Sequence, residues 1–202
     1  MDERIWVGTR KGVFTIERRN GRWGVADVAF LGDHCPMLLP HVRDGATYVA
    51  LEHGHFGAKL HRSRDGHTWE EVAVPTYPPK PEGEDANNPE YVKPIAWKLE
   101  KVWSLEAGHP SEPGVLWCGT IPGGLFRSSD AGASWQLVRS LWDEPRRKLW
   151  FGGGADLPGI HSICVDPRDG RHLFVGVSIG GVWETTDGGE TWDVRSLGLR
   201  AE

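Results

Sequence analysis

A hydroxyl, a carboxylate, a glycine and a tryptophan recur at fixed offsets close to the end of the sequence. In the segment TTDGGETW they are Thr185, Asp187, Gly189 and Trp192. Such a set could form a catalytic loop, a metal loop or a tight turn. Short side-chain oxygens accept hydrogen bonds from the N–H groups of a turn, glycine tolerates a positive φ, and tryptophan buries a large area. We therefore interpret Asp187 as a residue that holds a turn and as a poor candidate for a nucleophile.

Two glutamates elsewhere in the chain are the candidates for acid–base chemistry. Hydrolysis of a glycosidic bond needs two carboxyl groups that flank the bond, one held protonated and one ionised. Glu52 and Glu100 lie in different parts of the chain, and we predict that they could face each other as a catalytic pair. The alternative is that each forms an ion pair with a neighbouring lysine. Further candidate carboxylates are Asp143, Glu144 and Asp156.

A pair of histidines, His53 and His55, lies in a glycine-containing loop. Two histidines at this spacing can both bind one metal ion, and a third histidine elsewhere could join them. No cysteine or aspartate completes a recognised metal pattern, so we predict neither a metal nor another cofactor. A role in ligand binding or acid–base chemistry and simple packing of the loop are both left open. The third histidine could be His34, His41 or His61.

Large aromatic residues fall in the two longest predicted loops, and Tyr77 and Tyr91 are among them. A tryptophan ring in a loop can stack on the C–H-rich face of a sugar, but a long loop also needs aromatic anchors to stay folded. Both interpretations are kept. The predicted ligand-binding residues are Arg10, His53, His55, Trp97, Trp142, Trp150 and His161.

Four similar segments must position these residues. They cover 5–23, 48–69, 116–135 and 173–192, and each holds two strand-like runs joined by a glycine turn and closed by a tryptophan. Each closing tryptophan is followed by another alternating run, and the later three segments are preceded by one further strand. The unit is therefore four antiparallel strands, A to D, at the roughly 40–50-residue period of β-propeller blades. We predict an all-β fold with blades at about 4–30, 36–74, 98–141 and 160–197, the first lacking strand A.

Two of the segments carry a known motif in full, SSDAGASW at 128–135 and TTDGGETW at 185–192. They match the Asp-box or BNR motif, Ser/Thr-x-Asp-x-Gly-x-Thr/Ser-Trp, and SRDGHTW at 63–69 is one residue short of it. The chain thus resembles the sialidase-like Asp-box β-propellers, and more closely the bacterial glycosyl-hydrolase-like BNR proteins. The matched positions are Ser63, Asp65, Trp69, Ser128, Asp130, Gly132, Trp135, Thr185, Asp187, Gly189 and Trp192.

The resemblance implies a place for a site and a range of functions. The superfamily includes sialidases, xyloglucan-cleaving glycosidases, sortilin-type receptors and a photosystem assembly factor. Its Asp boxes lie opposite the active site, which implies a site among the B–C turns and the D–A connections between blades. Sialidases need three arginines around a carboxylate, together with a Tyr–Glu pair. This sequence has no Arg-Ile-Pro motif and no convincing arginine triad, which argues against sialidase activity.

Composition limits the class of protein. The chain has 202 residues and a formal net charge of −5, so we expect a single domain that binds neither nucleic acid nor an anionic membrane. Cys35, Cys118 and Cys164 form no CxxC pair, which is typical of free thiols in a reducing compartment. The start of the chain has no signal-like apolar region. We therefore predict a cytoplasmic protein.

The sequence ends after strand D of the fourth segment. We expect the four blades to be part of a six- or seven-bladed propeller. The alternative is a partial ring that self-associates with a second copy through its unpaired edges. In function, we predict binding of a carbohydrate or similar polar ligand on the B–C and D–A loops, with hydrolysis left open. The alternative is a non-enzymatic scaffold for protein–protein interaction or assembly.

Overall fold

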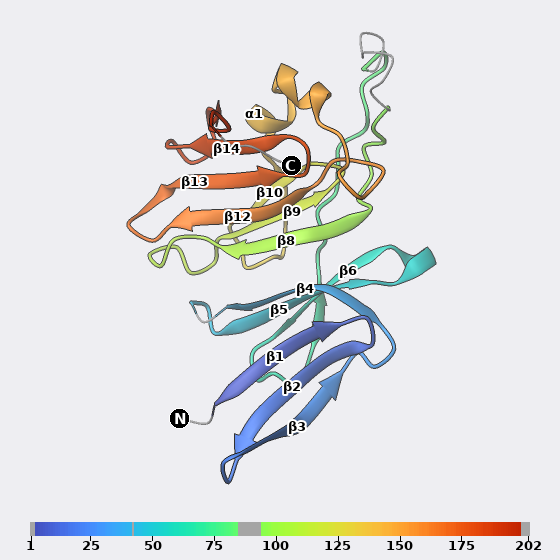
Figure 1. The fold of residues 1–202 in the computed structure, drawn as a ribbon, viewed down its shortest axis with the longest axis vertical. Helices are drawn as coiled ribbons and strands as arrows, with labels where there is room; N and C mark the ends of the chain where they lie inside the picture. Colours follow the sequence, from blue (N-terminus) through green and yellow to red (C-terminus); the bar gives the residue numbers. More distant parts are fainter. Residues whose placement is uncertain (1–2, 42, 85–93, 199–202) are drawn as a thin grey trace. The chain divides into compact units, whose positions relative to one another are not determined.

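The computed structural model describes residues 3–41, 43–84 and 94–198. The fold is all-β, as predicted, with only short helical segments between strands (Figure 1). The chain divides into unit 1 (residues 1–74) and unit 2 (residues 75–202), and each unit holds two antiparallel sheets. Within the described ranges, no helix is both long and apolar enough to span a membrane. Tyr91, one of the predicted loop aromatics, lies outside the described residues.

Unit 1 contains a three-stranded sheet followed by a four-stranded sheet. Its second hairpin turns at Asn20 and Gly21, whose φ angles of 51° and 77° suit a two-residue connection. The first sheet is β1 (Arg4–Thr9), β2 (Gly12–Arg19) and β3 (Arg22–Ala29). The second is β4 (His34–His41), β5 (Ala46–Glu52), β6 (Ala58–Ser63) and β7 (Glu70–Val72), with a short 3-10 helix η1 (Gly54–Phe56) after β5.

Unit 2 contains two four-stranded sheets in the order of the chain. The first is β8 (Lys101–Ala107), β9 (Leu116–Ile121), β10 (Leu125–Ser128) and β11 (Gln136–Leu137). The second is β12 (Ile160–Asp166), β13 (Asp169–Val177), β14 (Gly181–Thr185) and β15 (Asp193–Val194). Between them lie a short α-helix α1 (Arg139–Trp142) and a 3-10 helix η2 (Pro145–Leu149).

The strand order agrees with the sequence prediction of one three-stranded and three four-stranded sheets. One element differs. The alternating run at 136–141 was expected to be a strand throughout, but β11 ends at Leu137 and α1 begins at Arg139. The helical turn buries Leu141 and Trp142, each 1% exposed. Burial of these two apolar side chains therefore outweighs the strand pattern of the run.

Each Asp-box turn is held by its own side chains. In the last one, the Thr185 hydroxyl accepts the N–H of Gly189 (2.9 Å), and Asp187 accepts the N–H of Thr191 (3.0 Å). The Thr191 hydroxyl also donates to Asp187 (2.5 Å). Asp65 accepts a turn N–H in the same way (2.7 Å). These bonds stabilise the hairpin, which is the role expected of the motif.

The box hydrogen bonds predict a dependence of stability on pH. The Thr191 and Thr185 hydroxyls, in that order, hold the pKa of the Asp187 carboxyl well below its usual range. A carboxyl whose pKa is lower in the folded than in the unfolded state stabilises the fold at pH values above its unfolded pKa of about 3.9. This stabilisation is lost as the pH falls through the pKa of the folded state. We expect Asp187→Asn to lose less stability than the wild type between about pH 5 and about pH 3, measured by urea unfolding. Equal losses would contradict the expectation.

The two sheets of unit 1 share one apolar cluster. Val13 of β2 and Val49 of β5 are 1% and 0% exposed and belong to the same cluster. Trp69, which closes the box turn of the second sheet, packs edge-on against Trp6 of β1, with ring centroids 6.1 Å apart. Burial also raises the pKa of the nearby Cys35 thiol to about 11. The box turn therefore packs against the preceding sheet as well as closing its own hairpin.

Gly66, in the same box turn, allows this close packing. A Cβ at Gly66 would lie 2.5 Å from the Trp6 ring, whereas a Cβ at Gly21 would have no neighbour within 4 Å. Both glycines have positive φ, 81° and 77°, so alanine strains the backbone at either site. We expect Gly66→Ala to cost about 1–3 kcal/mol more than Gly21→Ala because of overpacking. Urea unfolding of the two variants measures the difference, and equal losses would show that Trp6 moves aside freely.

The two sheets of unit 2 enclose a larger apolar cluster. Leu173 and Val175 of β13 are 0% exposed, and Trp183 of β14 is 1% exposed. They belong to one cluster with Trp117 of β9 in the preceding sheet. Ser104 of β8 also donates a hydrogen bond to the carbonyl of β12 at Ile160 (2.9 Å). The third and fourth sheets therefore pack face to face, and they hold their A strands, β8 and β12, next to each other.

Candidate functional site

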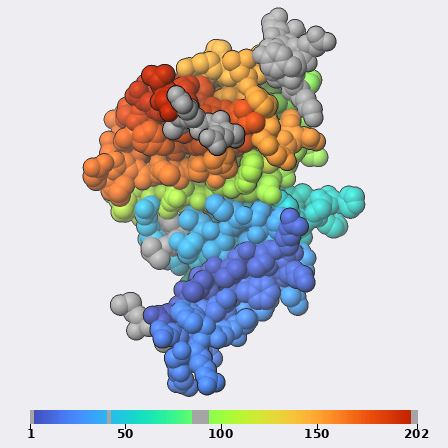
Figure 2. All heavy atoms as spheres, in the orientation of Figure 1, coloured from blue at the N-terminus to red at the C-terminus, as the bar shows by residue number. Residues whose placement is uncertain are grey.

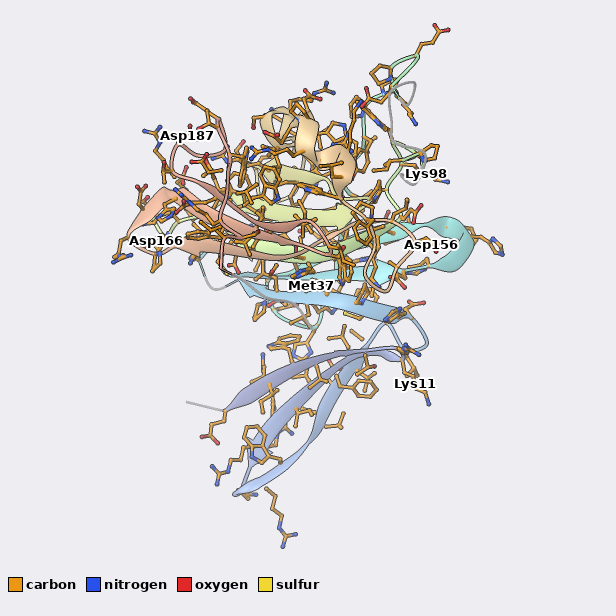
Figure 3. All side chains as sticks on the ribbon, turned by 45° about the horizontal axis from the view of Figure 1, so that its top comes forward. Lys11, Met37, Lys98, Asp156, Asp166 and Asp187 are labelled. Carbon is orange, nitrogen blue, oxygen red and sulfur yellow. The ribbon has the colours of Figure 1, made fainter. Side chains whose placement is uncertain are left out.

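The two ends of the strands in unit 2 carry different turns. β13 ends at Val177 and β14 begins at Gly181, so this B–C turn lies at the end where β12 begins. The box turn after β14 lies at the other end. Figure 3 shows Asp187 of the box turn and Asp156 of the D–A connection at opposite ends of these strands. Within unit 2, the B–C turn and the D–A connection therefore lie together, as the resemblance implied.

A pocket of about 560 Å³ lies at this end of unit 2. Both A strands contribute to it, with Trp103 from β8 and His161 from β12. Lys101, at the start of β8, lines it too. Its volume is in the range of roughly 300–1,000 Å³ that is usual for small-molecule sites. The full lining is Lys101, Trp103, Ile121, Gly153, Gly154, Ala155, His161, Ser178 and Ile179.

Trp103 and His161 form the aromatic part of the pocket. Their ring centroids are 6.1 Å apart and the rings are nearly perpendicular, at 71°. His161 is exposed, and its Nδ1 lies 3.0 Å from the Ser162 hydroxyl. Trp103 is half-buried, so part of its ring can contact a ligand. Nε2 of His161 can then donate or accept a hydrogen bond, depending on the tautomer.

The D–A connection forms a fixed wall of the pocket. The Ser178 hydroxyl accepts the N–H of Gly159 (2.9 Å), and the Ser178 N–H donates to the Gly159 carbonyl (2.9 Å). Any Cβ at Gly159 would collide with the Trp103 ring, so this position needs glycine. Phe151 donates its N–H to the carbonyl of Ile179 (3.3 Å). The connection is therefore tied to the B–C turn at two points.

The lining combines apolar side chains with a few polar groups. Trp103, Ile121 and Ile179 supply the apolar surface, while Lys101 and His161 supply nitrogen atoms. None of the described lining residues is acidic. Glycoside hydrolysis by the usual route needs two carboxyl groups. The pocket therefore has the chemistry for binding a polar ligand through stacking and hydrogen bonds, and its described lining holds no pair of carboxyl groups.

The two predicted catalytic glutamates occupy different environments. Glu52 is half-buried at the end of β5, and its carboxylate lies 2.7 Å from Nδ1 of His34. Glu100 is exposed and donates its N–H to the carbonyl of Ile121 (3.0 Å). Glu52 belongs to unit 1 and Glu100 to unit 2, so their pairing stays a prediction. The partner expected in the alternative was a lysine; the partner that the structure describes for Glu52 is His34.

The further carboxylates of the D–A connection also form local ion pairs. Asp143 lies 2.8 Å from Nε of Arg139, and Glu144 lies 2.7 Å from Nε of Arg146. Glu144 also caps η2 by accepting the Arg146 N–H (3.1 Å). The Arg146 interaction holds the pKa of the Glu144 carboxyl below its usual range. Glu144 is thus ionised near neutral pH and unsuited to act as a general acid.

The basic candidates of unit 1 lie at its own B–C end. Nε2 of His53 lies 3.6 Å from Asp33 in the preceding D–A connection, whereas His55 and Arg10 are exposed in their turns. Burial lowers the pKa of His61, which contacts Phe30 with ring centroids 4.7 Å apart. Among the residues described, no group of three or more His, Cys, Asp or Glu side chains could hold a metal ion. A ligand-binding role for His53, His55 and Arg10 stays a prediction.

The predicted loop tryptophans are packed inside unit 2. Trp142 is 1% exposed and Trp150 is 4% exposed, which corrects the prediction that they contact a ligand. Trp142 packs against Tyr77 and Trp97, at 5.0 and 5.2 Å between ring centroids, and Trp150 packs against Trp183 at 5.4 Å. They are the anchors of the long connection, as in the alternative interpretation. Trp97 is half-buried in the same aromatic group.

A buried arginine completes this anchor. Arg147 is 5% exposed, its guanidinium lies 3.9 Å from the centre of the Trp142 ring, and its Nε donates to the Trp142 carbonyl. Glu84 lies 3.6 Å away and offsets the charge. Burial nevertheless lowers the pKa of Arg147, which stays protonated because its ordinary pKa exceeds 12. The stacked pair fixes the start of the D–A connection, and thus the wall of the pocket.

Most of the pocket lining was not predicted from the sequence. His161 was among the candidates, but Trp103, Lys101, Ser178 and Ile179 were not. Trp103 was visible as an aromatic residue in a predicted A strand. The sequence does not indicate that the β8–β9 register is irregular at Trp103, or that the packing of the sheets leaves a pocket beside it. The aromatic residue is therefore visible in the sequence, but its place in a pocket depends on how two sheets pack.

Comparisons of sequence relate part of the chain to xyloglucan-degrading enzymes. A probable oligoxyloglucan-reducing end-specific xyloglucanase from Neosartorya fischeri is 35% identical over 88 residues, which are 43% of this chain and 10% of that protein. A xyloglucanase from Paenibacillus sp. is 35% identical over 74 residues, 35% of this chain and 6% of that protein. No protein-family model matches the chain. The match thus spans about a tenth or less of these relatives.

Comparisons of structure cover almost the whole chain. A GH74 xyloglucanase from Xanthomonas campestris aligns with a TM-score of 0.60 at 16% identity, over 94% of this chain and 27% of that one. YCF48 from Cyanidioschyzon merolae aligns with a TM-score of 0.59 at 15% identity, over 98% of this chain and 55% of that one. These likenesses show the fold: the sheets match a fragment of a larger β-propeller structure.

Proposed function

We propose that the chain is part of a β-propeller that binds an oligosaccharide or a similar polar ligand in the unit 2 pocket. The observation that carries the proposal is the accessible Trp103 ring beside His161 and Ser178. An aromatic face accepts the apolar side of a sugar ring, while nearby nitrogen and hydroxyl groups bind the sugar hydroxyls. The partial sequence similarity to xyloglucanases supports a β-glucan-type oligosaccharide as the first ligand to test.

The proposal is limited to binding. The described lining of the pocket has no carboxylate, and two carboxylates of the D–A connection, Asp143 and Glu144, are ion-paired. Hydrolysis would need an acid and a base brought by residues outside this lining. We therefore expect this chain alone to bind the sugar and to leave it intact.

Isothermal titration calorimetry with xyloglucan-derived oligosaccharides tests the proposal. We expect Trp103→Ala to weaken binding by about tenfold or more, equivalent to about 1.4 kcal/mol, because it removes the stacking surface. Trp23→Ala is the matched control: Trp23 is 48% exposed on β3 of unit 1, and its loss should leave the affinity unchanged. Equal affinities for the wild type and Trp103→Ala, or no binding by the wild type, would refute the proposal.

A second candidate function is favoured by one observation. Leu149, Phe151 and Ile179 are 52%, 54% and 49% exposed, and all three lie on the D–A connection or the B–C turn of unit 2. Exposed apolar groups near one another are typical of protein interaction surfaces. If this face binds a protein instead of a sugar, Phe151→Asp should abolish that binding while Trp103→Ala has little effect. The opposite order of effects is expected for the sugar.

A further inference from the structure

The first sheet of the chain has two apolar faces, and only one of them is packed within unit 1. Trp6 and Val13 point toward β4–β7 and join the cluster around Val49. Because side chains alternate along a strand, Ile5 and Val7 point the other way. Figure 1 shows β4 and β5 on one side of β1–β3 in unit 1.

Strand register places two apolar rows across this outward face. Ile5 pairs with Ile16, and Ile16 pairs with Val25, which forms the first row. A β-bulge next to Ile16 keeps the second row on the same face. Three of the six side chains, Ile5, Val25 and Val28, are 48%, 61% and 37% exposed, and the strands that carry them are drawn in dark to medium blue in Figure 2. The second row is Val7, Phe14 and Val28.

The same positions are fully buried in the last sheet. The sequence HLFVG at 172–176 repeats RIWVG at 4–8, and GVW at 181–183 repeats GVF at 12–14. Leu173 therefore corresponds to Ile5, and it is 0% exposed where Ile5 is 48% exposed. Trp183, which corresponds to the half-buried Phe14, is 1% exposed. These side chains of the last sheet pack on the preceding sheet, so this face of a repeat is built to be covered.

The closing tryptophans also indicate that the outward face of the first sheet is uncovered within unit 1. Trp69 packs on Trp6 of the preceding sheet, and Trp192 donates its indole N–H to Ser140, which follows the preceding sheet. Trp192 is 7% exposed, whereas Trp23 of the first sheet is 48% exposed. Trp23 therefore occupies the position from which Trp69 contacts the preceding sheet and Trp192 contacts the segment that follows the preceding sheet.

The face of a sheet that packs against the next box turn, here called the receiving face, carries a characteristic aromatic residue. Two sheets present an aromatic residue from their B strand to the next box turn: Trp6 of the first sheet meets Gly66, and Trp117 of the third lies 3.8 Å from a Cβ placed on Gly189. In the last sheet the corresponding residue is Phe174, by alignment of LFVG at 173–176 with LWCG at 116–119. Phe174 is half-buried, and its ring lies 5.0 Å from His172 of the same strand.

The face around Phe174 carries both charged and apolar groups. Glu184, opposite Phe174 on β14, pairs with Arg195 and His172, while apolar groups lie beside Phe174. Cys164 is its cross-strand partner and is exposed, and Val182 lies one row further, opposite Gly176. We infer that the outward face of β1–β3 docks on the Phe174 face of β12–β15 in a second copy of this chain. The contact is head-to-tail, since it joins two different faces. A contact between two β1–β3 faces would give Trp23 no receiving aromatic residue.

Light scattering coupled to size-exclusion chromatography tests the inference on the 202-residue chain. We expect the mass of the wild type to rise above that of a monomer as concentration increases. Val25→Lys and Phe174→Lys each remove one of the two faces, so each variant alone should be a monomer at the same concentration. An equimolar mixture of the two should form a one-to-one dimer, because each partner keeps the face that the other lacks. Leu31→Lys, at a 78% exposed loop position, should associate like the wild type.

Three results would overturn the inference. The first is a monomeric wild type at every concentration. The second is association that survives Phe174→Lys and is lost in Val25→Lys, which would indicate contact between two β1–β3 faces. The third is a mixture that stays monomeric while circular dichroism shows both variants folded. If Phe174→Lys does not fold, Cys164→Lys replaces it, because Cys164 lies on the same face and is already exposed.

Discussion

Replacing Leu173 by alanine should lower the free energy of unfolding by about 2–5 kcal/mol. Leu173 is 0% exposed in the apolar cluster of unit 2, between Trp117 and Trp183. Its truncation removes buried methyl groups and leaves a cavity that the rigid sheets can fill only in part. Urea unfolding followed by tryptophan fluorescence measures the loss.

The repeat supplies a matched control for this variant. Ile5 holds the corresponding position in the first sheet, but it is 48% exposed. We expect Ile5→Ala to cost less than about 1 kcal/mol at protein concentrations low enough to keep the chain monomeric. Equal losses in the two variants would contradict the account, because they would show that the outward face of β1–β3 is already covered within one chain.

Replacing Trp142 by alanine should lower the free energy of unfolding by about 3–5 kcal/mol. The ring is 1% exposed and packs against Tyr77, Trp97 and the guanidinium of Arg147. Its loss opens a cavity at the root of the D–A connection and leaves Arg147 without its stacking partner. Urea unfolding followed by far-UV circular dichroism measures the cost.

Trp142→Phe separates the anchoring role from a ligand-binding role. In the described structure, the buried indole N–H of Trp142 has no hydrogen-bond partner, so phenylalanine loses volume but no hydrogen bond. We expect a smaller loss of stability, under about 3 kcal/mol, and an unchanged affinity for the oligosaccharide. A selective loss of affinity at unchanged stability would contradict the assignment of Trp142 as an anchor.

Turns and strands that depend on residues close together in the sequence could be predicted from the sequence. The Asp-box turn depends on Thr185, Asp187 and Gly189, which contact one another within a few residues, so spacing alone identifies it. The strand order follows because four similar segments each encode a hairpin. By contrast, the run at 136–141 has a strand-like pattern and ends in α1, because burial of Leu141 and Trp142 decides its conformation.

The site depended on contacts that sequence spacing does not determine. Trp103 and Trp142 are both aromatic residues next to predicted loops, yet Trp103 lines a pocket and Trp142 is buried. The difference arises from how the third and fourth sheets pack and from where Arg147 inserts. Glu52 likewise has the residue type of a catalytic acid, but its partner His34 comes from the adjacent strand. The residue types that matter could be predicted from the sequence, but the surroundings of each side chain could not.

A crystal structure of the chain soaked with a xyloglucan-derived oligosaccharide tests the central claim most directly. The account predicts a sugar ring against the face of Trp103, with sugar hydroxyls within hydrogen-bond distance of His161 and Ser178, the polar residues beside it in the unit 2 pocket. Sugar bound elsewhere with this pocket empty, or no bound sugar at saturating concentration, would contradict it.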